Sequence, residues 1–216
     1  MRERDWPGAL FELLIVALGV LLGIQASNWN ASRDERRRTA QVVGVLRQDL
    51  QDGMDVEEKA AAEVDEGLAA FDAARKRGER PAPYVFRIPG ADNPPNTAWE
   101  SVLQTGLADI IDPALLFELG FFYSERQGIG VRYSHYARFV EDRILPWTDD
   151  PSHFYDVTGA LRPEYAANME RLRDWRGFIS VTIKTAHCLD GRLARPAEPG
   201  RSCRANYGPR FSPQPA

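Results

Sequence analysis

The stretch Leu13-Leu-Ile-Val-Ala-Leu-Gly-Val-Leu-Leu-Gly-Ile24 decides the architecture, because every residue in it is apolar or glycine. In the wider range 8–26, Glu12 and Gln25 are the only polar residues. A helix of that length rises about 1.5 Å per residue and reaches roughly 28 Å, close to the hydrocarbon thickness of a bilayer. The sequence therefore predicts a transmembrane helix over residues 9–29.

The flanks of this stretch support a membrane anchor. Trp6 and Trp29 stand where interfacial aromatic residues lie in membrane helices, so both are predicted to be interfacial anchors. Charged residues crowd outside both ends, in a short N-terminal tail at 1–8 and in the run Arg33–Arg38. A cleavable signal peptide is the alternative, since a short apolar run also suits the core of such a peptide. Against it, the helical pattern continues through Trp29 without a break.

One face of the predicted membrane helix carries small residues and a carboxylate. Glu12, Gly19 and Ala26 recur at intervals of seven and therefore share a face, which Gly23 and Ser27 extend. Small residues let helices approach closely, and an intramembrane carboxylate prefers protein or water to lipid. Besides the bilayer itself, we expect a homodimer partner or another membrane protein on this face. In the alternative reading, Glu12 extends to the membrane interface and the glycines make no contact.

The same residues resemble a known family. Glu12 lies seven residues before Gly19, and the helix ends in Gly23-Ile-Gln-Ala-Ser-Asn-Trp-Asn30. This pattern resembles the N-terminal signature of a family of uncharacterised bacterial single-pass membrane proteins, a domain of unknown function. In that family a Gly-Glu pair opens an apolar helix that ends in a Gln-x-Asn-Asn-Trp-Asn-like motif. The segments Trp99–Leu107 and Phe121–Tyr123 resemble a second recurrent block of the family.

The resemblance covers about half of the chain and implies architecture rather than activity. The chain departs from the family pattern at Phe11, where glycine is usual, and at Ser27, where asparagine is usual. The family has no assigned activity. What the resemblance implies is a single-pass protein of the bacterial inner membrane.

Beyond the anchor, the spacing of apolar residues predicts an all-α bundle over residues 30–189. Apolar residues continue at three- and four-residue steps, so the membrane helix is expected to run on as a long amphipathic helix to about Arg77. Gly78 and then Pro81 are typical of a helix end. Two further long helices and one short helix are expected, over residues 97–106, 112–145 and 163–189.

Local signals set the starts of these helices and the segments between them. Thr97-x-x-Glu100 has the form of a capping box, and Asp112-Pro113 supplies a cap and a first-turn proline. Residues 79–96 contain five prolines and are expected to be extended, with room for a short strand, and residues 147–161 are expected to form a loop. The arginine- and proline-rich residues 190–216 are expected to form an irregular tail.

Two cysteines bear on the compartment of the soluble domain. Cys188 and Cys203 can form a disulfide that would fasten the tail to the last helix, but only in an oxidising compartment. The four arginines after the membrane helix outnumber the two before it, which by the positive-inside rule favours a cytoplasmic domain. Because Asp34 and Glu35 dilute those arginines, we expect the domain on the periplasmic side.

Aromatic residues of the bundle are the candidates for a ligand site. Trp99, Phe121, Tyr133, Tyr136 and Trp175 are expected either to line a pocket or to form the ordinary core of the bundle. Pockets for small molecules are mostly apolar with a few polar groups, which this set would fit.

The sequence predicts no catalytic, cofactor-binding or metal-binding residues. His135, His153 and His187 lie far apart, and no serine-nucleophile or zinc-protease motif occurs. A net charge of −4 gives no basic field for nucleic acid. We therefore expect a membrane-anchored interaction protein, a scaffold or accessory of the bacterial envelope, rather than an enzyme. The alternative is an extracytoplasmic small-molecule sensing domain that acts through a partner.

Overall fold

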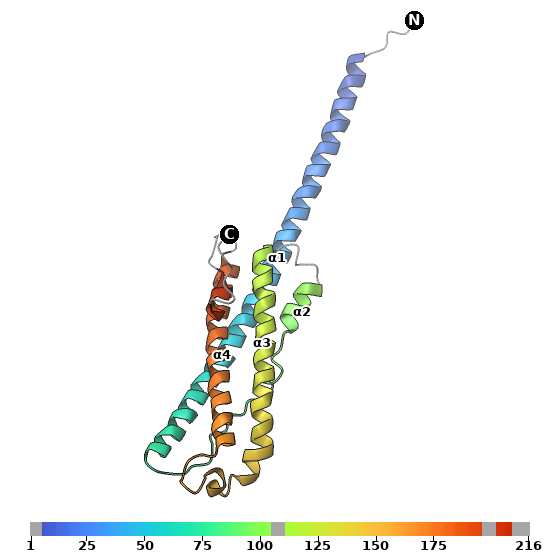
Figure 1. Cartoon of the computed structure of the whole chain (residues 1–216). Helices are drawn as coiled ribbons and strands as arrows, with labels where there is room; N and C mark the ends of the chain where they lie inside the picture. The colour runs from blue at the N-terminus through green and yellow to red at the C-terminus, as the bar shows by residue number, and fades with distance from the viewer. Residues whose placement is uncertain (1–5, 105–110, 196–201, 209–216) are drawn as a thin grey trace. The chain divides into compact units, whose positions relative to one another are not determined.

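The computed structural model describes residues 6–104, 111–195 and 202–208, with side chains from residue 13 onward. In these ranges the chain is all-α, as the sequence predicts, and its β pairing is limited to one isolated bridge between Tyr155 and Leu161. The α-helices of this part are α1 (Trp6–Lys76), α2 (Thr97–Gln104), α3 (Pro113–Phe139) and α4 (Pro163–Ala194) (Figure 1). The chain divides into two compact units, Met1–Gly44 and Val45–Ala216.

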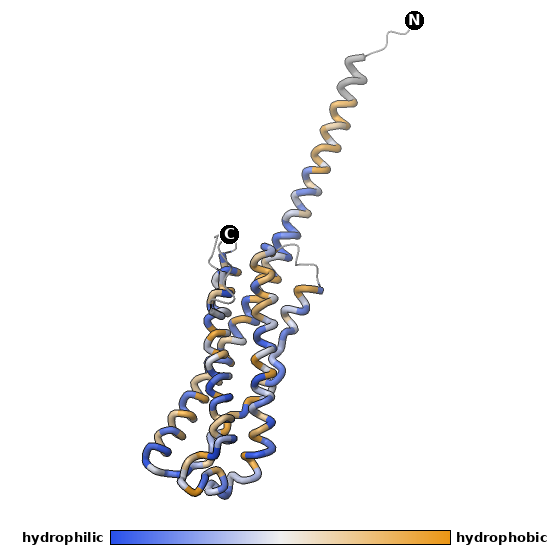
Figure 2. The backbone as a smooth tube through the Cα atoms, viewed as in Figure 1, coloured by the Kyte–Doolittle hydropathy of each residue, from blue (hydrophilic) through white to orange (hydrophobic). Residues whose placement is uncertain are grey.

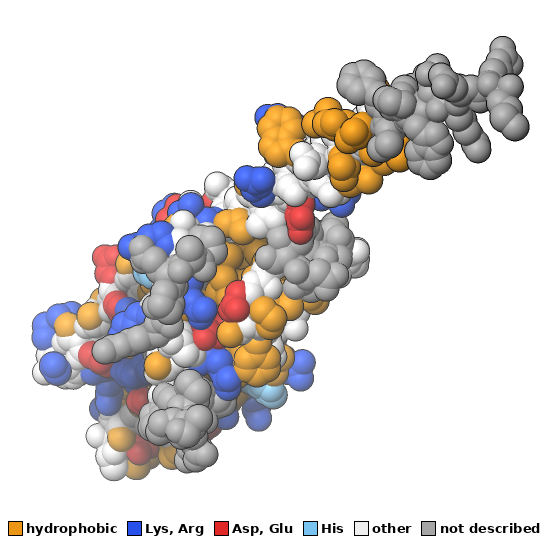
Figure 3. All heavy atoms as spheres, turned by 90° about the horizontal axis from the view of Figure 1, so that it is seen from above, with side chains coloured by type: hydrophobic (Ala, Val, Ile, Leu, Met, Phe, Trp, Pro, Cys, Tyr) orange, Lys and Arg blue, Asp and Glu red, His pale blue; other side chains and the backbone are white. Residues whose placement is uncertain are grey.

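The first unit is the N-terminal part of α1. Its apolar residues from Leu13 to Ile24 are exposed, with Leu13 at 70% of its full accessible surface. The same segment is the continuous hydrophobic stretch of α1 in Figure 2, and hydrophobic side chains gather on it in Figure 3. Within the described residues, α1 is the one helix that is long and apolar enough to cross a membrane. A contiguous exposed apolar surface of this kind is typical of segments that contact a bilayer or another protein.

In the second unit, the C-terminal part of α1 packs with α3 and α4 around a common core (Figure 1). Of the apolar positions that recur at three- and four-residue steps along α1, Val43 is half-buried, and the following are buried: Leu46, Leu50, Met54, Ala61, Val64, Leu68 and Phe71. Arg47 pairs with Asp190 and Asp72 with Arg173, so ion pairs also join α1 to α4. The helix ends at Lys76, and Gly78 adopts a φ of 83°, the left-handed conformation that follows many helix ends.

The proline-rich segment after α1 crosses the core without forming a strand. Its backbone groups are held instead by two tyrosines of α3: Tyr136 accepts the N–H of Phe86 at 2.9 Å, and Tyr133 accepts the N–H of Ile88 at 3.0 Å. Phe86 itself is buried. The two tyrosine hydroxyls thus accept the backbone hydrogen bonds that a neighbouring strand would otherwise accept. They satisfy buried N–H groups in a segment whose five prolines disfavour regular strand pairing.

Helix α3 begins as the sequence predicts and ends differently. The Asp112 carboxylate accepts the N–H of Leu115 at 2.9 Å, and Pro113 stands in the first turn. The α-helix stops at Phe139, however, and continues as a π-helical turn η2 (Val140–Ile144) and a 3-10 turn η3 (Leu145–Trp147). Pro146 has no N–H and its ring would clash with the carbonyl one turn earlier, so the α ladder cannot pass through it. The following loop holds a further 3-10 turn, η4 (Pro151–Phe154).

Helix α4 ends five residues beyond the predicted Leu189, at Ala194. Its last turn is fixed by tertiary contacts: Leu193 is buried, and Arg192 pairs with Glu118 of α3 at 2.6 Å. Part of the expected irregular tail is ordered as well, in the 3-10 turn η5 (Cys203–Tyr207). The composition of this part of the chain resembles a tail, but residues 190–194 continue α4 and residues 203–207 form a 3-10 turn.

Candidate functional site: a cavity with one charged and one apolar end

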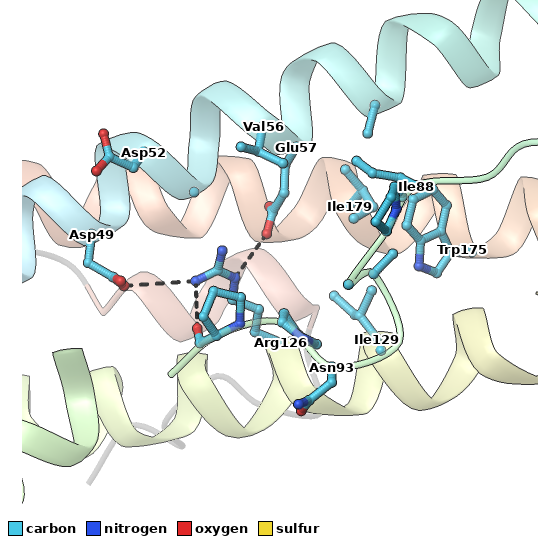
Figure 4. A pocket seen from close by; sticks show the side chains of 18 residues that line it. Asp49, Asp52, Val56, Glu57, Ile88, Asn93, Arg126, Ile129, Trp175 and Ile179 are labelled. Atoms are coloured by element: carbon cyan, nitrogen blue, oxygen red, sulfur yellow. Dashed lines mark hydrogen bonds and ion pairs between the residues drawn. The ribbon is translucent and has the colours of Figure 1, made fainter. Parts of the chain in front are cut away.

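A cavity of about 310 Å³ lies in the second unit. Four separate segments line it: residues 49–60 of α1, residues 88–95 of the proline-rich segment, residues 126–130 of α3, and Trp175 with Ile179 of α4. Figure 4 shows charged side chains at one end and isoleucines with a tryptophan at the other. A volume of this size suits a small organic molecule.

Arg126 organises the charged end. Its side chain is 10% exposed, and its Nε donates to the Glu57 carboxylate at 3.2 Å. Its Nη1 lies 3.8 Å from the Asp49 carboxylate and 3.5 Å from the carbonyl oxygen of Pro95 (Figure 4). A buried charge has to be paired in this way, because an isolated one would lose its hydration without compensation.

Gly53 leaves room for the guanidinium of Arg126 to lie against α1. A Cβ at residue 53 would lie 2.8 Å from Nη2 of Arg126, inside contact distance. Helix α1 runs through Gly53 as one helix. The glycine therefore serves close approach of Arg126 rather than a change in helix direction.

Burial changes the titration of the groups around Arg126. The pKa of Glu57 is raised to about 7, because desolvation of its carboxylate outweighs the attraction and hydrogen bond of Arg126. Tyr123 donates to the Asp49 carboxylate at 2.7 Å, and burial together with that carboxylate raises the pKa of the tyrosine. Near neutral pH, Glu57 thus changes its charge, whereas Tyr123 stays neutral.

The apolar end is formed by Ile88, Ile129, Ile179 and Trp175 (Figure 4). Trp175 is 3% exposed, and its ring also contacts the rings of Phe86 and Tyr133. Its indole Nε1 is buried and has no hydrogen-bond partner among the described atoms. A buried donor without a partner is uncommon in a protein interior, and here it belongs to a residue that lines the cavity.

Gly130 of α3 lines the cavity and lets the proline-rich segment contact the helix closely. A Cβ at this residue would lie 2.7 Å from the carbonyl oxygen of Asp92 and 2.7 Å from Cδ of Pro94. The proline-rich segment thus lies directly against α3 at this point. Gly128, two residues earlier, has no atom within 4 Å of the same hypothetical Cβ.

The five aromatic residues singled out in the sequence do not meet in one cavity. Tyr133, Tyr136 and Trp175 share the core, where the Tyr133 ring lies 5.2 Å from Trp175 and 5.9 Å from Tyr136. Trp99 instead stacks on Tyr123 at 5.4 Å, and Phe121 contacts Tyr207 edge to face. Of the five, Trp175 alone lines the 310 Å³ cavity.

The sequence reasoning missed the charged residues of the site. Asp49, Glu57 and Arg126 are not among the candidate site residues of the sequence analysis. One signal was present: Arg126 lies four residues after Phe122 and three before Ile129, on the apolar and buried face of α3. An arginine in that position needs a buried carboxylate as its partner.

The predicted contact face of the membrane helix lies in the first unit. Gly19 and Gly23 have no atom within 4 Å of a hypothetical Cβ, and Ala26 and Ser27 are exposed. The side chain of Glu12 lies outside the described residues, as does that of the predicted interfacial anchor Trp6. The other anchor, Trp29, is exposed and has the guanidinium of Arg33 4.8 Å from its ring centre.

Cys188 and Cys203 form a disulfide, with their Cα atoms 5.6 Å apart. The bond joins α4 to η5, and the buried carboxylate of Glu118 supports the junction. Glu118 accepts the backbone N–H of Cys203 at 3.1 Å as well as the guanidinium of Arg192. Cys203 is therefore fixed to both α3 and α4.

Comparison with other proteins leaves the family open. Neither the models of known protein families, nor curated protein sequences, nor solved structures contain a match to this chain. The resemblance of Glu12 to Asn30 to a family of bacterial single-pass membrane proteins therefore stays a prediction from the residues that carry it.

Proposed function

We propose that this protein is a membrane-anchored helical domain that binds a small amphipathic molecule in its cavity. The cavity carries the proposal, because its volume, its apolar lining and its few convergent polar groups are those of small-molecule sites. Asp52 is exposed at the charged end, so a ligand can reach that end from solvent. This favours the sensing alternative of the sequence analysis over a scaffold that acts through its outer surface alone.

A ligand screen with the full chain in nanodiscs tests binding. Val56 lines the cavity and is 53% exposed, so Val56→Trp should fill the opening without disturbing the core. Val45 lies on the same helix with the same exposure and does not line the cavity, so Val45→Trp is the matched control. We expect at least one amphipathic compound to raise the melting temperature of the wild type and of Val45→Trp, but not of Val56→Trp. Equal shifts in all three proteins, or none in any, would refute the proposal.

The proposal places the domain on the outer side of a bacterial inner membrane. The apolar segment of α1 supports an anchor, and the Cys188–Cys203 disulfide supports an oxidising compartment. A C-terminal fusion to a reporter that folds only in the periplasm should be active, and one to a reporter that works only in the cytoplasm should be silent. The opposite pattern would move the domain to the cytoplasm.

The membrane helix supports a second function, docking on another membrane helix. Gly19 and Gly23 lie four residues apart with open space around them, as in close helix pairs. Cross-linking in membranes should trap a dimer or a heterologous complex that Gly19→Leu with Gly23→Leu abolishes. Recovery of the chain alone, as a monomer, would count against this function and leave ligand binding untouched.

A further inference from the structure

We infer that a groove between α3, with its π-helical turn η2, and α4 is a further binding site, which takes a soluble phosphate ester. The two helices lie side by side (Figure 1), and the groove has a volume of about 410 Å³. It shares no lining residue with the 310 Å³ cavity, so it is a separate site from the one in the proposed function. Six residues line the groove: His135, Arg138, Phe139, Asp142, Arg143 and Arg171.

Arginines outnumber carboxylates in this groove. Arg138, Arg143 and Arg171 line it together with one acidic residue, Asp142. The three arginines are exposed, and none of them forms an ion pair with a carboxylate of the described residues. Three arginines and one aspartate leave two positive charges in excess, in a chain whose net charge is −4. An anion that binds between the arginines relieves their mutual repulsion.

The acidic residues beside the groove have other partners. Glu170, which precedes Arg171 on α4, pairs with Arg173 at 2.8 Å. Glu141 of η2 pairs with Arg87 of the proline-rich segment at 3.4 Å. Neither carboxylate is therefore directed at the arginines of the groove, which keep a positive charge available for a ligand.

The π-helical turn η2 helps to bring two of the arginines into the groove. In an α-helix, side chains five positions apart point about 140° away from each other. Arg138 and Arg143 are five positions apart, yet both line the groove. The N–H of Leu145 donates to the carbonyl oxygen of Val140, five residues earlier, so the turn is wider than an α turn and this angle is smaller. Single π-helical turns within α-helices are frequent at functional sites.

Arg171 is held at the groove by contacts with both helices. Its Nη1 donates to Oδ1 of Asn168, a fully buried residue of α4, at 3.3 Å. Its guanidinium carbon lies 5.8 Å from the ring centre of Phe139 on α3. The arginine is thus positioned before a ligand arrives, which lowers the entropy cost of binding. Phe139 also offers an apolar surface to the carbon skeleton of an ester.

A phosphate ester matches the groove better than a carboxylate does. A phosphate monoester carries about −1.5 to −2 charge at neutral pH and has three terminal oxygens that accept hydrogen bonds. Guanidinium groups recognise such oxygens through paired N–H donors. The ester balances the two excess charges, whereas a carboxylate supplies one negative charge. Because the groove lies between two helices, a small soluble ester can enter it, while headgroups of a flat bilayer contact protruding surfaces.

Equilibrium dialysis with the full chain in zwitterionic nanodiscs tests the site with three probes. Glucose 6-phosphate carries a phosphate ester, glucuronate carries a carboxylate on the same kind of ring, and glucose carries neither. We expect glucose 6-phosphate to bind about tenfold more tightly than glucuronate, and glucose not to bind. Val56→Trp should leave this binding unchanged, because Val56 lines the other cavity.

Paired variants assign the contacts. Arg143→Gln removes an exposed arginine of the groove and should weaken binding of glucose 6-phosphate about tenfold. Arg132→Gln is the matched control, because Arg132 is an exposed arginine of α3 that lies over the ring of Phe178 and does not line the groove. It should leave the affinity nearly unchanged. Asp142→Asn removes the carboxylate of the groove and should tighten binding about threefold.

Equal affinities for glucose 6-phosphate and glucuronate, equal effects of the two arginine variants, or no binding of glucose 6-phosphate would overturn the inference. Binding confined to vesicles that contain phosphatidylglycerol, measured by flotation, would also overturn it, because the ligand would then be a lipid headgroup. Loss of glucose 6-phosphate binding in Val56→Trp would place the ester in the 310 Å³ cavity. That result would overturn the groove as a site and leave the proposed function standing.

Discussion

The backbone N–H of Phe86 donates a hydrogen bond of 2.9 Å to the hydroxyl oxygen of Tyr136, and both residues are buried. Because Phe86 lies in an extended segment without a neighbouring strand, this hydroxyl is the acceptor on which its amide depends. The contact ties the proline-rich segment, and with it one wall of the cavity, to α3.

Tyr136→Phe should therefore destabilise the protein by about 1–3 kcal/mol, the cost of leaving a buried amide without an acceptor. Tyr84→Phe is the control, since the Tyr84 hydroxyl donates to the Glu63 carbonyl at an exposed site and its loss should cost less than about 0.5 kcal/mol. Urea unfolding of both variants in detergent gives the two values. Equal losses would mean that the buried amide finds another partner.

Gly130→Ala should destabilise the bundle by about 1–3 kcal/mol, because the new methyl group meets the backbone of Asp92 and the ring of Pro94. Gly128→Ala, in the same helix with open space around it, should be neutral or stabilise by up to about 1 kcal/mol through helix propensity. Thermal unfolding compares the two variants. A stabilised Gly130→Ala would show that the proline-rich segment moves away from α3 at no cost.

The stability of the domain should fall between about pH 5 and pH 7.5 through Glu57. Its pKa is raised from 4.5 to about 7 in the folded state, so the folded chain binds this proton more tightly than the unfolded chain. The resulting stability is complete below pH 4.5 and disappears as the pH rises through 7; for a shift of this size it amounts to about 3 kcal/mol.

Glu57→Gln isolates this effect, because the amide oxygen can still accept from Arg126 while the side chain no longer titrates. The charged groups nearby, Asp49 and Asp52 on α1 and Arg126 on α3, are unchanged, as is Tyr207 on η5. The difference in unfolding free energy between variant and wild type should grow with pH over this range. A difference that does not change with pH would place the Glu57 pKa near its ordinary value.

Removal of the disulfide should cost about 3 kcal/mol if the entropy of the 15-residue loop governs the effect. We expect this loss in Cys188→Ala with Cys203→Ala, and an equal loss when the wild type is treated with a reductant that reaches the bond. Protease cleavage near Cys203 should accelerate in both cases. A reductant effect on the cysteine-free variant would point to a cause other than this bond.

The helices could be predicted because their signals are local. The apolar stretch from Leu13, the periodic inner face of α1, and Asp112 with Pro113 each act within a few turns of one helix, so no tertiary information was needed. The π-helical turn after Phe139 and the extension of α4 to Ala194 were missed. Both depend on tertiary contacts rather than on local sequence signals. For example, the ion pair between Arg192 of α4 and Glu118 of α3 joins residues that are far apart in the sequence.

The cavity could not be predicted from the aromatic residues, because hydrophobic size marks a core and a pocket alike. Trp99 and Trp175 look equivalent in the sequence, yet one stacks on Tyr123 and the other lines the cavity. The groups that give the site its character are Arg126 and the carboxylates of α1, which lie 69 positions apart in the case of Glu57. Pairing over such a distance is fixed by the packing of α3 on α1.

The four-segment construction of the cavity also has a consequence for the living cell. Because residues near 50, 90, 128 and 175 all contribute to its wall, the cavity exists only while the whole bundle is folded. A ligand that occupies it adds its binding free energy to the stability of the domain and reduces the population of opened chains that proteases degrade. Under the proposed function, the steady-state amount of this protein should then rise and fall with the supply of the molecule that fills the cavity.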